Sequence, residues 1–193
     1  MIRDPKVLSF GLLVAACNGI SFSYLAEGSF YLIEMLGLSP AFYGFSFIGI
    51  AASGFIGSYI SKKLHEQQYS ESHIISFGNS VIFSGALAFT LGTLFFYWLS
   101  ASTIYSLVLT LACMSVIMIG IRMMIPSLLS GALNEYKHAI GTASSLFGFY
   151  YYCMISLFTL FMGMLHNDTL FPMPIYFLGI SIGIYIIRKL FVK

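Results

Sequence analysis

Charged residues are scarce in this sequence. Asp, Glu, Lys and Arg together make up 8% of the 193 residues, whereas apolar residues reach 59%, and the mean hydropathy is +0.90. A water-soluble domain cannot cover its surface with so few charges, so a soluble fold is excluded. The net charge is only +2, and the basic residues occur in ones and twos. Because no basic stripe could follow a phosphate backbone, we expect no nucleic-acid partner.

Motifs of enzymes and of metal sites are also missing. The three cysteines, Cys17, Cys113 and Cys153, lie in different apolar runs without CxxC or Cys/His spacing, and we interpret them as packing residues. The four histidines fall in loops or at helix ends and lack the spacing of a metal site. No Ser/His/Asp set, Walker loop or dinucleotide fingerprint is visible. The sequence therefore predicts neither an enzyme nor an ATP-driven pump, and it predicts no cofactor.

Long apolar runs fill the chain instead. A bilayer core about 30 Å thick needs roughly 20 apolar residues per helix, and the runs lack the alternation of a membrane β-barrel. We therefore predict an all-α, multi-pass membrane protein with one six-helix transmembrane domain over residues 1–193. Its spans are expected at about 7–27, 41–61, 74–99, 103–133, 139–165 and 171–187. Ser39 and Pro40 supply a capping hydroxyl and a first-turn proline for the second span.

The positions of Lys and Arg indicate how the spans are oriented. Eight of the nine basic residues fall at the same end of the predicted bundle, and the opposite connections contain none. These eight are Arg3, Lys6, Lys62, Lys63, Lys137, Arg188, Lys189 and Lys193. Because Lys and Arg concentrate on the cytoplasmic side of membrane proteins, we expect both termini to be cytoplasmic.

Several stretches resemble the C-terminal half of a major facilitator superfamily transporter, closest to the Bcr/CflA drug-resistance exporters. Residues 28–44 are similar to the family's connection between its seventh and eighth helices, although the proline usual near Gly28 and Ser29 is missing. Residues 126–148 resemble the tenth-to-eleventh helix region, and residues 165–173 resemble the short loop before the twelfth. A degraded copy of the superfamily's cytoplasmic loop motif is formed by Gly57, Ser61, Lys62 and Lys63.

The resemblance implies a proton-coupled antiporter of the bacterial inner membrane, of the multidrug efflux type that confers antibiotic resistance. It would export hydrophobic or amphipathic compounds by alternating access between two six-helix halves. Its partners would be the lipid bilayer, protons and a drug-like small molecule. The chain matches only one half, so we expect it to need a second six-helix half or another copy of itself. Two alternatives remain, namely a truncated, non-transporting membrane protein that only binds partners, and a homodimeric channel or carrier.

Glu27 ends the first apolar run and is the first candidate for proton coupling. Ser23, Tyr24 and Tyr31 share its helical face and are candidates for lining a cavity. As a functional residue, Glu27 would load and release a proton. Alternatively, it is an acid at the outer interface that faces water.

Arg122 is the second candidate for proton coupling, because it lies inside the run 103–133, which would span about 46 Å as one helix. If that helix continues to Leu133, Arg122 lies within the membrane and needs a carboxylate or carbonyl partner. If the membrane ends near Pro126, Arg122 extends to the interface. Asn18, on the opposite face from Glu27, is a weaker cavity-lining candidate, because structural hydrogen bonding would also explain it.

Small residues recur at helical spacing in two spans. They are Gly49, Ser53 and Gly57 in the second span, and Gly141, Ser145 and Gly148 in the fifth. Such ridges let helix backbones approach closely in lipid, so we expect both to pack inside the bundle.

Overall fold

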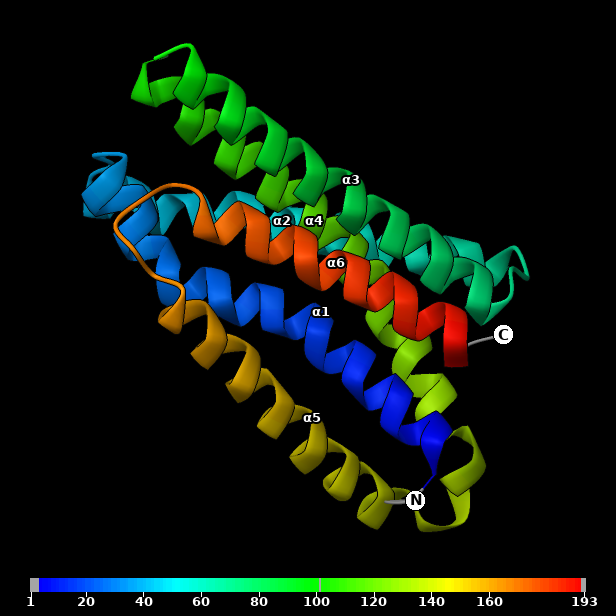
Figure 1. The fold of residues 1–193 in the computed structure, drawn as a ribbon. Coiled ribbons are helices and arrows are strands. Elements are labelled where there is room, and N and C mark those ends of the chain that lie inside the picture. The colour runs from blue at the N-terminus through cyan, green and yellow to red at the C-terminus, as the bar shows by residue number, and fades with distance from the viewer. Residues whose placement is uncertain (1–3, 101, 192–193) are drawn as a thin grey trace.

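The computed structural model describes residues 4–100 and 102–191, and within these residues the chain forms six long helices and no strand (Figure 1). They are α1 (Pro5–Ser29, continued by the π-helical segment η1, Phe30–Met35), α2 (Pro40–Glu66), α3 (Glu71–Trp98), α4 (Thr103–Leu133, followed by the 3-10 segment η2, Asn134–Ala139), α5 (Ile140–Met164) and α6 (Pro172–Phe191). Each is long and apolar enough to cross a bilayer. The predicted all-α fold with six membrane-spanning helices is confirmed.

Polar side chains and prolines define where the helices begin. Ser39 accepts a hydrogen bond from the backbone N–H of Phe42 at 3.4 Å, and Pro40 occupies the first turn of α2. This start was predicted from the sequence and is confirmed. Asp4 caps α1 in the same way by accepting from the backbone N–H of Lys6 at 3.0 Å. These bonds satisfy N–H groups that have no partner within the helix.

The helices pack as two related units of three. α1 and α4 contact each other at the centre, α5 packs on α1, α2 packs on α4, and α3 and α6 contact each other while covering α4 and α1. In Figure 1, α6 lies between α1 and α3, and α5 lies on the other side of α1. When α1, α2 and α3 are exchanged for α4, α5 and α6, respectively, the same pairs of helices are in contact. Because each unit has an odd number of spans, the two cross the membrane in opposite senses, as inverted repeats do.

Glycines let α4 approach its neighbours closely. A Cβ on Gly120 would lie 2.7 Å from the carbonyl oxygen of Gly78 on α3, and a Cβ on Gly57 of α2 would overlap the carbonyl oxygen of Ile119. Backbone therefore meets backbone on both sides of α4, which is how helices gain packing energy where lipid competes for apolar surface. By contrast, Gly49 and Gly141 have open space beside them. The expected packing is found for Gly57 but not along the whole of either ridge.

Basic residues collect at one end of the bundle. The two termini of the described chain, the α2–α3 connection and η2 all lie at this end (Figure 1), which we call the basic end. It carries Lys6, Lys62, Lys63, Lys137, Arg188 and Lys189. Arg3 and Lys193 lie outside the described residues. The opposite end, which we call the far end, holds η1 and the α3–α4 and α5–α6 connections.

Because Gly57 contacts α4 and Gly49 does not, substitutions at these two glycines of α2 should differ in their effect on stability. Gly57→Ala should destabilise the bundle by about 1–3 kcal/mol, because the added methyl meets backbone that cannot move aside. Gly49→Ala is the matched control, since it adds the same methyl to the same helix in open space. Thermal unfolding of the purified chain in detergent would measure both. Equal melting temperatures for the two variants would contradict the proposed contact.

Candidate functional site

A hollow of about 470 Å³ lies between α1, α2 and α4. It exists because α1 and α2 both pack on α4 but scarcely on each other. We call it the α1–α2–α4 hollow; its walls include Tyr24, Phe47, Ile50, Phe55, Met118 and Arg122. Neither α3 nor α6 contributes to the lining, so the hollow opens on the side of the bundle that these two helices leave uncovered. It is apolar apart from a few hydroxyl groups and one cation.

Arg122 supplies that cation. α4 continues through Pro126 to Leu133, which is the arrangement in which Arg122 lies within a membrane span. Its stem lies along Gly54 of α2, with Cγ 3.4 Å and Nε 3.6 Å from where a Cβ on Gly54 would be. The residue is exposed and forms no ion pair or hydrogen bond with any residue that the structure describes. The hollow therefore holds a positive charge that has no counter-ion within the described chain.

Glu27 lies elsewhere, at the far end of α1, in a cluster with two residues of the α5–α6 connection. Its Oε2 is 2.9 Å from Nδ1 of His166, and Nε2 of His166 is 3.1 Å from Oδ1 of Asp168. The Glu27 side chain is 12% exposed, whereas that of Asp168 is 96% exposed. The ring of Phe30 lies 5.5 Å from that of His166. Glu27 thus faces a histidine at the rim of the bundle.

The protonation state of His166 follows from this geometry. The hydrogen bond to Glu27 and the charge of that carboxylate raise the pKa of His166 above its usual value, and Asp168 adds to the effect. When protonated, the imidazolium donates from both ring nitrogens, one to each carboxylate. No feature of the sequence identifies His166 as the partner of Glu27, because the two residues are 139 positions apart and no local spacing signals the contact.

Of the other cavity-lining candidates, only Tyr24 lines the α1–α2–α4 hollow. Tyr24 lines the hollow and is fully buried, and its hydroxyl makes no hydrogen bond of standard geometry with a described residue. Ser23 is also buried, but it does not line the hollow. Tyr31 packs its ring against Phe89 near the far end. Asn18 is half-buried and donates to the Val14 carbonyl at 3.0 Å, which is the structural hydrogen bond considered as its alternative role.

The loop-motif residues occupy the basic end of α2. Ser61 is buried, Lys62 lies 3.7 Å from Glu66 one turn later, and the ammonium of Lys63 lies 5.0 Å from the centre of the Tyr59 ring. These are solvent-side contacts at a helix end, apart from the hollow.

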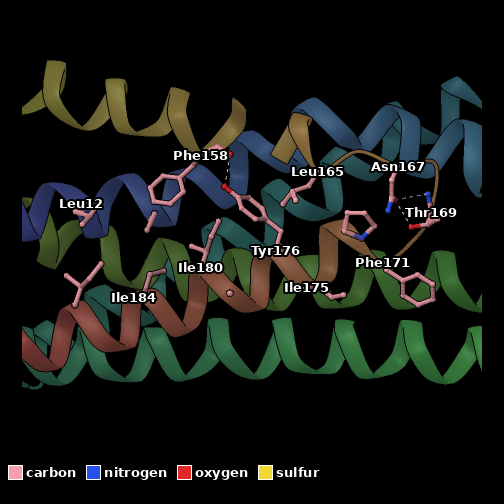
Figure 2. Close-up of a pocket in the computed structure, with 15 residues that line it drawn as sticks. Leu12, Phe158, Leu165, Asn167, Thr169, Phe171, Ile175, Tyr176, Ile180 and Ile184 are labelled. Atoms are coloured by element: carbon pink, nitrogen blue, oxygen red, sulfur yellow. Dashed lines mark hydrogen bonds between the residues drawn. The ribbon is translucent and has the colours of Figure 1, made fainter. Parts of the chain in front are cut away.

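A second cavity, of about 850 Å³, runs between α1, α5 and α6. Figure 2 shows its walls, which are almost entirely apolar and include Leu12, Phe158, Leu165, Ile180 and Ile184. The hydroxyl of Tyr176 donates to the Phe158 carbonyl at 2.7 Å, so it is already satisfied. We call this cavity the α1–α5–α6 groove. It presents no charged side chain and is suited to hydrocarbon.

The six apolar helices and their paired packing define a multi-pass membrane protein. The chain is 32% identical over 95% of its length to a Rickettsia bellii protein named uncharacterized transporter, and 29% identical over its full length to a Rickettsia felis protein of the same name. An uncharacterized protein of Rickettsia conorii is 36% identical over 48% of the chain and 80% of its own length, and the chain belongs to the same family as this protein. No protein-family model matches the chain.

The chain spans about half the length of the two relatives named as transporters, covering 46% of one and 49% of the other. Over that half, the chain is a multi-pass membrane protein with six apolar helices.

The His166 cluster predicts a pH-dependent contribution to stability. Because the folded protein raises the pKa of His166, the stabilisation is fully present below the usual value of about 6.5 and is lost as pH rises through the raised value. His166→Asn should therefore lower the melting temperature in detergent more at pH 6 than at pH 9. His138→Asn, which removes an exposed histidine of η2, is the control. An equal loss for His166→Asn at both pH values would contradict the ionic contact.

Proposed function

We propose that this chain is one six-helix half of a proton-coupled antiporter of the major facilitator type, and that it exports hydrophobic or amphipathic compounds together with a second six-helix half. The single observation that carries the proposal is the hollow between α1, α2 and α4, which opens on a face that the chain leaves uncovered. In transporters built from repeats, substrate sites lie near the middle of the membrane where two such units meet.

The uncovered face has the features of a surface that meets another helical unit. α2, α4, α1 and α5 form a layer in this order, and α3 and α6 cover only one side of it. On α5, Gly141 has open space beside it and Gly148 has a neighbour only at 4.0 Å, so this small-residue ridge is free for close helix contact. Since the chain covers about half of its longer relatives, the partner that fits best is a second six-helix half.

The Glu27–His166 pair is our proposed site of proton uptake. A carboxylate that is mostly buried and bound to a histidine gives two groups that can exchange a proton between them. The pair lies at the far end, and Tyr24, one turn earlier on α1, lines the hollow. A change in the charge at Glu27 therefore acts on the helix that forms one wall of the proposed substrate site.

The proposed location is the inner membrane of a bacterial cell, with both termini in the cytoplasm. The support is the basic end, which carries the Lys and Arg residues of both termini and of two connections, whereas the far-end connections have none. Positive residues are retained on the cytoplasmic side during membrane insertion.

Exchange of one half of a relative provides the test. The chain would replace the matching half of the R. bellii transporter, and efflux of the neutral hydrophobic dye Nile red would be measured in everted vesicles with an imposed pH gradient. We expect efflux by the chimera and a loss of about tenfold or more in Glu27→Gln, because an amide cannot take up and release the proton that couples transport. Glu34→Gln, which changes an exposed acid at the same end, should retain efflux.

Two results would contradict parts of this proposal. Undiminished, gradient-driven efflux in Glu27→Gln would remove Glu27 from proton coupling. No efflux from a correctly inserted chimera, with Nile red or with anionic amphipathic dyes, would favour the non-transporting alternative.

A further inference from the structure

The α1–α2–α4 hollow contains a charge that no described residue compensates, inside the candidate membrane span Thr103–Leu133. Gly54, against which the Arg122 stem lies, is eight residues before Lys62, so it is about 12 Å from the basic edge along α2. α2 and α4 run in the same direction, and Gly54 is one turn nearer the far end than Gly57, which contacts Ile119. The guanidinium stem is therefore directed into the hollow and not toward the basic end.

The groups around Arg122 include no acid. Among the described residues that line the hollow, the other titratable side chain is Tyr24, and the remaining polar ones are the serine hydroxyls Ser21 and Ser58. The Ser21 hydroxyl is directed to the sulfur of Met118 at 3.5 Å, and the Tyr24 hydroxyl is buried without a standard hydrogen bond. A bare cation in an apolar recess is costly, and an anion bound to it would offset that cost.

The shape and lining of the hollow indicate what kind of anion fits. Its volume of about 470 Å³ lies within the range of small-molecule sites. Phe47, Ile50 and Phe55 give the hollow an apolar wall on α2, and Arg122 is the only cation in its described lining. A guanidinium binds planar carboxylates and phosphates with paired hydrogen bonds, whereas it repels the cationic amines common among amphipathic drugs.

We propose that the hollow is a binding site for amphipathic anions, in which Arg122 holds a carboxylate or phosphate head and the α2 wall holds the apolar tail. That these anions are the exported substrates rests on the proposed transport function. That the hollow binds them does not. The same head chemistry occurs in free amphiphiles and in anionic lipids. The site therefore has two candidate sources of ligand that an experiment must separate.

Photo-crosslinking of the chain in phosphatidylcholine nanodiscs tests the site. The probe is a twelve-carbon carboxylate with a photoreactive diazirine in its tail, and labelled peptides are identified by mass spectrometry. We expect labelling of peptides from the hollow, reduced about tenfold in Arg122→Gln and less in Arg122→Lys, because lysine keeps the charge but not the paired hydrogen bonds. Lys137→Gln, which removes an exposed cation of η2, should leave the labelling unchanged.

The α1–α5–α6 groove provides an internal control for folding. Because it presents no charged side chain, it should label equally with the carboxylate probe and with a matched alcohol probe, and equally in every variant. An Arg122→Gln protein that keeps groove labelling is folded, so a loss at the hollow then reports the missing guanidinium.

Competition experiments distinguish lipid headgroups from free amphiphiles as the ligand, and anion binding from non-specific binding. Dodecyl phosphate and dodecanoate should displace the probe from the hollow, whereas dodecanol and dodecyltrimethylammonium should not. If phosphatidylglycerol added to the nanodisc displaces the probe, the ligand of the site is a lipid headgroup. If it does not displace the probe, the ligand is a free amphiphile. Labelling that is independent of Arg122, or equal competition by all four compounds, would overturn the anion site. So would loss of labelling in the chimera with a second half, because Arg122 would then pair with a protein carboxylate.

The outcome also distinguishes this inference from the proposed function. Arg122-dependent labelling without efflux by the chimera would support the anion site and contradict transport. Efflux by the chimera without Arg122-dependent labelling would support transport and overturn the anion site.

Discussion

The contact of α4 with two neighbouring backbones is the interaction on which the rest of the arrangement depends. Gly57 of α2 meets the backbone at Ile119, and Gly78 of α3 meets it at Gly120, so two successive residues of α4 are held from two sides. Lipid offers apolar surface as good as that of any side chain, so close van der Waals contact is what holds such helices together. With α4 fixed at this level, Arg122 follows within one turn and faces the gap that α1 and α2 leave between them.

The two candidate sites are connected through α1. Tyr24 borders the hollow, and Glu27, one turn farther along the same helix, bonds to His166 of the α5–α6 connection. α1 is also the most enclosed helix, with 78% of its most apolar stretch buried. A helix with so many neighbours cannot shift by itself, and movement at one end must be accommodated by α4, α5 and α6. In the proposed exporter, this is how protonation at the far end would alter a substrate site nearer the centre.

Sequence patterns predicted the helices well and their neighbours poorly, for a physical reason. Apolar run length, the Ser39 cap and Pro40 report on local backbone and solvent, which is why the number and type of the helices agree with the structure. A small-residue ridge reports only that close contact is allowed. Gly57 makes a close helix contact, whereas Gly141 makes none with a described residue.

The same limit applies to the candidate sites. The cost of a charge in the membrane drew attention to Glu27 and Arg122, but no local signal indicated that His166 lies beside one and that no described residue pairs with the other. Nor did any local signal indicate that the two residues belong to different sites.

If the uncovered face lines a water-accessible cavity between two halves, thiols placed on it in the chimera will react with water-soluble reagents. In a background without Cys17, Cys113 and Cys153, a cysteine would replace Phe55, which is exposed on α2 at the hollow, or Leu91, which is exposed on α3. Charged maleimides react with thiols in water and not in hydrocarbon. We expect fast labelling at position 55 and none at position 91. Equal protection of both positions would show that the hollow does not face a water-filled cavity.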